Sequence, residues 1–297
     1  MTARPPTVLV RPGHPVHRGR TAGFRKLLRG VPVSAAFGLL VVIAYVLTAL
    51  LAPWLAPHGE AEIVGNSYDP WGGDFLLGTD QLGRDVLSRL IYGARNSIGI
   101  AFMTTCLSFL VGGALGLLTA VVGGWTDQLL ARVVDVLMAI PQLVFTLVLV
   151  SIFGSSVINL ILIIAMLDAT RVFRLSRAVA TNVVAMEFIE AARLQGQTLL
   201  WIMTREVLPN ILPPLVAEFG LRFCFVFLTI SALSFLGLGI QPPSADWGAM
   251  VRENASLITY ADITPLLPAG AIALLTVAVN FVVDWFLHKS SGLKDGR

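Results

Sequence analysis

The chain has 297 residues, of which 56% are hydrophobic and 13% charged, and its formal net charge at pH 7 is +3. About a quarter of the residues of a soluble domain are charged, so this composition, with a mean hydropathy of +0.79, excludes an ordinary soluble protein. It predicts an all-α, polytopic membrane protein in a lipid bilayer, with no nucleic-acid partner.

The N-terminal tail, residues 1–32, holds the one basic cluster of the sequence and contains no acid. Before an apolar segment, such a cluster is typical of a cytosolic anchor attracted to anionic lipid. A signal peptide is the alternative, but its apolar core has roughly 7–15 residues, and the run Val33–Ala52 is longer and lacks an obvious cleavage site. An uncleaved first span is therefore expected. The basic residues are Arg4, Arg11, Arg18, Arg20, Arg25, Lys26 and Arg29.

Five segments are long and apolar enough for a membrane-spanning helix, which needs about 20 residues. A sixth, starting near Val157, is ambiguous because its apolar run ends at Asp168 and then meets three arginines. Most lysines and arginines fall on one side of the membrane only if this segment also crosses, and basic residues favour the cytosolic side of short loops. We therefore predict six spans with both termini in the cytosol. The five clear segments are Val33–Ala52, Ile98–Val122, Leu129–Phe153, Phe219–Leu238 and Pro268–Leu287.

The charged end of the predicted fourth span is expected to emerge into the cytosol. Asp168 and Arg171, three residues apart on a helix, can partly neutralise each other there. In the second span, Gly112 and Gly116 have the small-xxx-small spacing that lets helices approach closely, which favours internal packing over gating. Pro141 is expected to kink the third span, because it removes a backbone donor.

The loop after the first span, within residues 33–94, contains the stretch "DQLGRDVLSRLIYGAR". It places Leu82, Val86 and Leu90 on one helical stripe, with polar residues largely on the other face. Such a helix is expected to lie along the outer membrane interface instead of crossing it. The turn-rich loop "QPPSADWG", residues 241–248, is expected on the same side. The polar residues are Arg84, Asp85, Ser88 and Arg89.

Residues 187–210, "EFIEAARLQGQTLLWIMTREVLPN", interrupt the apolar segments on the cytosolic side. We expect a helix carrying Glu190, a turn or close approach at Gly196, and a second helix through Leu199 and Ile202 that Pro209 breaks. Exposed apolar residues at this place suit insertion into a groove of a partner. Packing on the protein's own cytosolic face is the equal alternative.

The stretch "EAARLQGQTLLWIMTREVLPN" resembles the EAA signature of binding-protein-dependent ABC importer permeases. Residues 78–97, 123–141 and 233–251 resemble, in the same order and spacing, the C-type permease subunit of the dipeptide, oligopeptide and nickel family. The resemblance covers 78 to about 288 and implies the ABC type-1 permease fold, with a permease core at 95–288 and a cytosolic tail at 289–297. It also implies a multi-pass protein of the bacterial plasma (inner) membrane.

The resemblance also implies the partners. These are a homologous second permease subunit, two cytosolic ATPase subunits that use ATP, and an extracytoplasmic solute-binding protein. The ATPases would dock on a coupling helix made by Glu190, Ala191, Ala192, Gly196, Ile202, Leu208, Pro209 and Asn210. The binding protein would face Asp80, Arg84, Asp85, Trp247 and Gly248.

Two departures from the family pattern concern single residues. Glu206 stands where the family usually has histidine, and Glu218 and Arg222 form an i,i+4 pair where the family is commonly uncharged. Intramembrane charges are candidates for function. This pair is expected near the cytosolic end of the span, and each of its charges can be neutralised by the other. A structural ion pair is therefore favoured over contact with a substrate.

Several kinds of site are missing from the sequence. There is no G-x-x-x-x-G-K-[ST] loop, no H-E-x-x-H and no G-x-S-x-G, so neither catalytic residues nor metal ligands nor a directly bound cofactor are predicted. The alternative to an ATP-driven importer subunit is a secondary transporter or channel, which predicts broken spans and buried carboxylates near the midplane. Peptides are the leading substrate class, with nickel chelates, glutathione-like compounds and opines left open.

Overall fold

The computed structural model describes residues 31–290, which form helices and connecting loops. The basic cluster of the N-terminal tail, and residues 291–297 of the C-terminal tail, lie outside the described residues. The helices are α2 (Val33–Leu50), α3 (Ala52–Leu55), α4 (Val86–Val122), α5 (Gly124–Met138), α6 (Gln142–Phe153), α7 (Val157–Val184), α8 (Glu187–Leu194), α9 (Leu199–Trp201), the π-helix η1 (Ile202–Val207), α10 (Leu208–Phe235), α11 (Trp247–Glu253), the 3-10 helix η2 (Ala255–Tyr260) and α12 (Leu266–Ser290).

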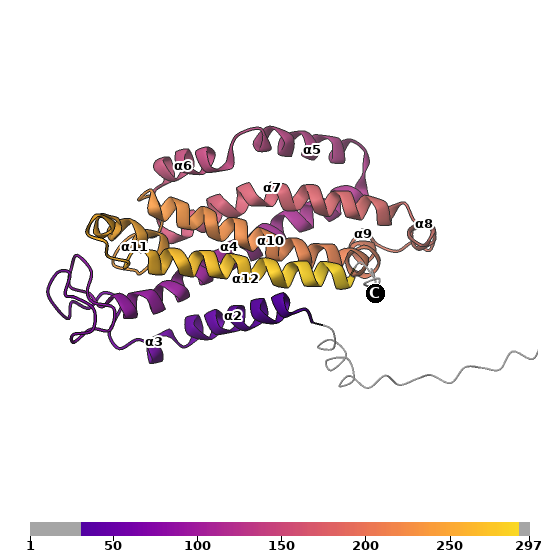
Figure 1. The fold of residues 1–297 in the computed structure, drawn as a ribbon. Coiled ribbons are helices and arrows are strands. Elements are labelled where there is room, and N and C mark those ends of the chain that lie inside the picture. The colour runs from indigo at the N-terminus through magenta and orange to yellow at the C-terminus, as the bar shows by residue number, and fades with distance from the viewer. Residues whose placement is uncertain (1–30, 291–297) are drawn as a thin grey trace, which may run out of the picture.

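The long helices run along one another in an elongated bundle (Figure 1). Helix α4 packs most extensively on α7, and α2 packs on α4 and α12. Helices α5 and α6 lie along α7 on one side of the bundle. Two regions occupy opposite ends in Figure 1. We call residues 56–85 with 236–265 the loop end, and residues 185–207, which contain α8 and α9, the short-helix end.

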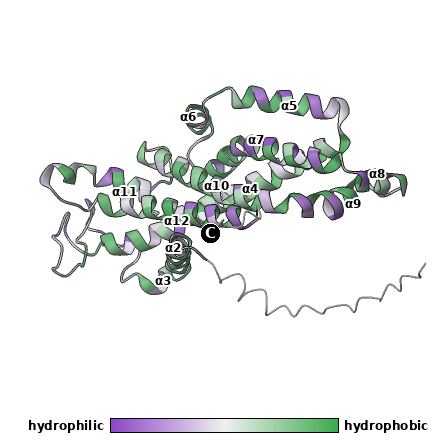
Figure 2. Cartoon of the chain, turned by 45° about the vertical axis from the view of Figure 1, so that its right-hand side comes forward, coloured by the Kyte–Doolittle hydropathy of each residue, from purple (hydrophilic) through white to green (hydrophobic). Residues whose placement is uncertain are grey.

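Four helices among residues 31–290 are long and apolar enough to cross a membrane: α2, α4, the continuous helix Leu199–Phe235, and α12. Helices α5 and α6 would make a fifth span if counted together, but they are bent by 86° where Pro141 precedes α6. The kink expected there is therefore confirmed, and it divides the third predicted span. Figure 2 shows hydrophobic residues along the bundle helices, with hydrophilic residues interspersed on α5 and α7. The count of six spans stays a prediction.

Helix α4 corrects the expectation of a separate interfacial helix. The side chain of Asp85 accepts hydrogen bonds from the backbone N–H groups of Leu87 and Ser88, so a helix begins at Val86. That helix continues without a break to Val122. The stretch expected along the interface is therefore the first part of a 37-residue helix.

Two other helix boundaries also differ from the sequence prediction. Helix α7 continues through Asp168 to Val184, so this acid lies near the middle of a 28-residue helix and not at its end. Pro209 does not break the chain between the short-helix end and α10. It stands in the first turn of α10, and the π turn η1 joins α9 to α10 there, so the helical path continues past a residue that has no N–H to donate.

The glycines of α4 bring this helix against α7. A Cβ atom at Gly112 would lie 2.3 Å from the carbonyl oxygen of Ala169, and one at Gly116 would lie 2.8 Å from that of Phe173. Since no real Cβ approaches a backbone atom so closely, only glycine permits this packing. The prediction that these residues serve internal packing agrees with this geometry.

Apolar packing is divided into two clusters. One, toward the loop end, contains Trp247, Phe227 and Leu233. The other joins the short-helix end to α4 and α7 through Ile189, Ile202 and their neighbours. Each end of the bundle is thus fixed by buried side chains of its own.

Candidate functional site

The segment 187–210 forms a compact helix–turn–helix at the short-helix end. Helix α8 ends at a turn in which Gly196 has φ +77°, a conformation that glycine adopts without steric cost. The hydroxyl of Thr198 then accepts a hydrogen bond from the backbone N–H of Trp201 at 3.3 Å and caps α9. The turn and second helix expected from the sequence are both present.

One face of this segment is attached to the bundle. Ile189, Ala192 and Ile202 are buried against α4 and α7. The guanidinium of Arg193 donates a hydrogen bond of 2.8 Å to the carbonyl of Val121, at the C-terminal end of α4, where the partial negative charge of a helix favours a cation. The segment is therefore a fixed feature of the fold.

The rest of the segment is exposed and carries several large apolar side chains among charged ones. The side chains of Leu194 and Leu200 are 83% and 69% exposed, and Phe188 and Leu199 are also exposed. Scattered apolar residues on a surface are ordinary, but a contiguous group marks a place of contact. The group lies at the end of the bundle (Figure 1), beyond α7.

The eight residues predicted to dock on an ATPase divide between these two faces. Ala192 and Ile202 are buried and Leu208 is half-buried, so their side chains support the segment from within. The exposed ones are Glu190, Ala191, Gly196, Pro209 and Asn210. Leu194 and Leu200 are the most exposed apolar residues of this segment. The sequence analysis did not include them among the docking residues, because these two positions are not part of the motif.

The five residues predicted to face a binding protein are all buried at the loop end, namely Asp80, Arg84, Asp85, Trp247 and Gly248. The role expected of them stays a prediction, but in this fold their side chains are covered. The reason is that the loop folds over the first turns of α4, so the charged face of that helix points into the protein.

A network of four buried charges holds the loop end together. Arg84 Nε lies 2.7 Å from Asp80 Oδ2, and Arg89 Nη2 lies 3.0 Å from Glu253 Oε2 on α11. Each arginine also contacts the second acid: Arg84 Nη2 lies 3.3 Å from Glu253 Oε2, and Arg89 Nε lies 3.4 Å from Asp80 Oδ2. Two cations and two anions balance here, as buried charges require. Glu253 could not be found from the sequence, because about 160 residues separate it from its partners.

A groove is open to solvent at the same end. It lies between the loop residues Tyr68 and Trp71 and the segment that contains Leu257 and Asp262. The indole N–H of Trp71 donates a hydrogen bond of 3.1 Å to the hydroxyl of Thr264, and this bond links the two walls of the groove. The surface that a partner can reach at the loop end is formed by these residues and not by the five predicted ones.

A third polar group lies in the middle of the bundle, at the level of the spans. Asp168 of α7 is fully buried, and its Oδ1 lies 3.6 Å from Arg222 Nη1 on α10 and 3.9 Å from Arg171 Nη1. Arg222 Nε lies 2.7 Å from Glu218, so the expected pairing of these two residues is present. Because α10 begins at Leu208, Arg222 lies near the middle of the helix and not at its cytosolic end.

Arginines of α7 contact the broken helix pair on that side of the bundle. Arg171 contacts the amide oxygen of Gln142, and Arg177 forms a two-pronged ion pair with Asp127. Arg174 Nη1 lies 3.7 Å from the sulfur of Met138. Among residues 31–290, no three His, Cys, Asp or Glu side chains are grouped so that they could hold a metal ion.

Comparisons with known proteins agree with this arrangement. Residues 112–290 match the family model described as "Binding-protein-dependent transport system inner membrane component". The chain is 37% identical over 258 residues to the di/tripeptide transport system permease protein DppC of Pseudomonas aeruginosa, covering 84% of this chain and 85% of that protein. It is 33% identical to the dipeptide transport system permease protein DppC of Haemophilus influenzae (84% and 88% covered).

Two further similarities widen the comparison. The glutathione transport system permease protein GsiD of Pectobacterium atrosepticum is 33% identical, with 88% of this chain and 87% of that protein covered. A solved structure titled "Crystal structure of an amino acid ABC transporter with histidines" superposes with a TM-score of 0.51 and 18% identity, covering 69% of this chain and 99% of that chain. At this identity the superposition shows the fold alone.

Proposed function

The chain belongs to the family of binding-protein-dependent transport system inner membrane components, and from this premise we propose that it is the permease subunit of a peptide importer. As a member it is a multi-pass membrane permease of the ABC importer class and not a catalytic subunit. Peptides are the proposed substrate, because relatives named as di/tripeptide and dipeptide permeases match over most of the chain. The glutathione permease is compatible with the same class, since glutathione is itself a small peptide.

The short-helix end is proposed as the docking site for a cytosolic ATPase subunit. What supports this is the exposed apolar face around Leu194 and Leu200, on a segment that buried Ile189 holds firmly. A fixed platform with uncovered apolar residues suits a groove on a partner. ATP would be bound and hydrolysed by two such ATPases, and a homologous second permease would complete the translocation path.

The loop end is proposed to face an extracytoplasmic binding protein, through the groove of Tyr68, Trp71 and Leu257. On this proposal both termini would lie in the cytosol, and the membrane would be the bacterial plasma membrane. The buried charge network supports the proposal, because a loop that receives a partner needs a defined shape.

Co-purification tests the docking proposal. Leu194→Glu with Leu200→Glu should lose the ATPases from the purified complex but retain the second permease, whereas Leu76→Glu, equally exposed but at the loop end, should retain both. Gly196 is a poor target, because any side chain there strains the turn itself. ATPases retained by the double variant would show that the short-helix end is not the docking site.

The alternative of a secondary transporter is not favoured, because the matching family and relatives are binding-protein-dependent permeases, although two features of the fold are shared with such transporters. Buried Asp168 and the 86° bend between α5 and α6 are features that such transporters share. Uptake into vesicles decides between the two. Transport that requires ATP and the binding protein supports the importer, and transport by the chain alone without ATP would refute it.

A further inference from the structure

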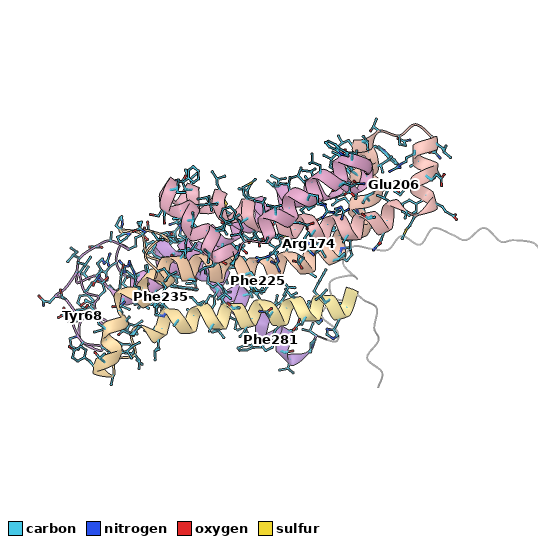
Figure 3. All side chains as sticks on the ribbon, turned by 90° about the horizontal axis from the view of Figure 1, so that it is seen from above. Tyr68, Arg174, Glu206, Phe225, Phe235 and Phe281 are labelled. Atoms are coloured by element: carbon cyan, nitrogen blue, oxygen red, sulfur yellow. The ribbon has the colours of Figure 1, made fainter. Side chains whose placement is uncertain are left out.

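The bend between α5 and α6 and the arginines of α7 form one site. The last residue of α5, Met138, contacts Arg174, and the first residue of α6, Gln142, contacts Arg171. Arg171 also lines a small cleft with Ile140 and Thr170. Figure 3 labels Arg174 between Tyr68 at the loop end and Glu206 at the short-helix end, so the site lies away from both ends of the bundle.

The charges around this cleft are unevenly paired. The Oδ1 atom of Asp168 lies 3.6 Å from Arg222 Nη1 and 3.9 Å from Arg171 Nη1. Arg222 also forms an ion pair with Glu218. Arg174 forms no ion pair with any residue from 31 to 290. Asp135 lines a neighbouring cleft with Arg174 and Arg177, but Arg177 is already paired with Asp127. The four arginines and four acids named here balance in net charge, but Arg171 has no carboxylate nearer than 3.9 Å and Arg174 forms no ion pair among residues 31–290, so the potential is locally positive at these two guanidinium groups.

The backbone adds to this positive potential. No side chain caps the N-terminus of α6, which begins at Gln142 beside Arg171. The free N–H groups of a helix N-terminus attract anions, and interrupted membrane helices present such ends to the anionic groups of substrates. The Arg171 side chain is 38% exposed, so a ligand can reach it.

We propose that Arg171 and Arg174, with the N-terminus of α6, bind the C-terminal carboxylate of the peptide during its passage. This rests on the proposed function as a peptide permease. A carboxylate fits because two guanidinium groups and free N–H groups offer only donors. Because Arg174 forms no ion pair with any residue from 31 to 290, it can bind an anion without giving up a partner. Buried Asp168 lies beside the site, with its Oδ1 3.9 Å from Arg171 Nη1 and 3.6 Å from Arg222 Nη1, so it compensates the charge of Arg171 only in part.

Transport by the complete complex in proteoliposomes tests the proposal, with alanyl-alanine and alanyl-alanine amide as the two probes. Arg171→Gln should lower the uptake of alanyl-alanine per ATP hydrolysed by at least about tenfold. This is the fold-change that corresponds to the loss of one hydrogen bond to a charged group. ATP hydrolysis stimulated by the binding protein should persist, and Arg171→Lys should retain more uptake than Arg171→Gln. Arg132→Gln on exposed α5 removes a charge outside the site and should behave as wild type.

Two outcomes would overturn the carboxylate site. One is normal uptake of alanyl-alanine by both Arg171→Gln and Arg174→Gln. The other is an equal loss for alanyl-alanine and its amide, which would show that Arg171 only supports the fold. Failure of the wild-type complex to transport either peptide with ATP would instead refute the proposed function.

A second measurement does not depend on the binding protein. Ile140→Cys, in a background with Cys106 and Cys224 replaced by serine, places a thiol on the half-exposed wall of the cleft. Alanyl-alanine should slow its reaction with a charged thiol reagent, the amide should not, and Arg171→Gln should abolish the protection. Equal rates with and without alanyl-alanine would contradict the proposal.

Discussion

The two ends of the bundle use charged and apolar side chains in opposite ways. At the loop end, Asp80, Arg84, Arg89 and Glu253 are buried and paired with one another. At the short-helix end, the side chains of Leu194 and Leu200 are exposed, whereas the buried contacts are mainly apolar. Residue type alone therefore does not tell which side chains a partner can reach, and the fold around each motif decides it.

The largest expected effect tests whether the loop end depends on its buried charges. Arg89→Ala leaves Arg84 as the one cation of the network against two buried acids, Asp80 and Glu253, and breaking a buried pair destabilises a protein by about 3–5 kcal/mol. The melting temperature of the purified chain in detergent should fall strongly. Arg95→Ala, on the exposed side of the same helix, is the control, and similar melting of the two variants would show that the network contributes little.

The corresponding test at the short-helix end removes an apolar contact. Ile189 is 1% exposed, so Ile189→Ala should reduce the free energy of unfolding by about 2–5 kcal/mol. Leu194→Ala on the same helix should change it by less than about 0.5 kcal/mol, because that side chain lies in the open. Chemical denaturation in detergent measures both, and an equal effect would mean that Leu194 is also covered.

A smaller effect is expected at the seam between α4 and α7, which joins the two ends. Gly112→Ala forces a methyl group to within 2.3 Å of a carbonyl oxygen, and overpacking of this kind costs about 1–3 kcal/mol. Gly99→Ala on the same helix meets nothing within 4 Å and serves as control. If thermal melting shows both alanines to be neutral, the close approach is not required.

The smallest effect concerns pH at the loop end. Burial raises the pKa of the Asp246 carboxyl above its usual range, against hydrogen bonds from Ser97 and Ala249. The folded protein therefore holds this proton at pH values where the unfolded chain has released it, and stability falls as pH rises from the usual value toward the raised one. The melting temperature of wild type minus that of Asp246→Asn should decrease over this window and level off above it. A constant difference would contradict the assignment.

Local patterns predicted the parts of the fold that depend on neighbouring residues. The turn at Gly196, the bend before Pro141 and the packing role of Gly112 all follow from the conformational limits of one or two residues. The boundaries of α4 and α10 were wrong, because the interruption expected between "DQLGRDVLSRLIYGAR" and the second span, and the one expected at Pro209, do not occur.

Contacts between distant residues could not be predicted from the sequence. The stripe of Arg84, Asp85 and Arg89 suggested an exposed face, and only the position of Glu253 on α11 explains why that face is buried. The same holds for Asp168, whose burial depends on Ser108 and Arg222 from two other helices. Polar periodicity reports which residues share a face of a helix, but not what covers that face.

The unbroken helical path from Leu199 to Phe235 has a mechanical consequence. At about 1.5 Å per residue its 37 residues reach roughly 55 Å, and it carries exposed Leu200 at one extremity, Arg222 midway, and Ser231 against Gly248 near the other. The path is continuous but not uniform, because the π turn η1 and two prolines inside α10, Pro213 and Pro214, lie between α9 and Arg222. Prolines and π turns are the usual places where a helix bends, so a displacement of α9 meets the most easily bent turns of the path before it reaches Arg222.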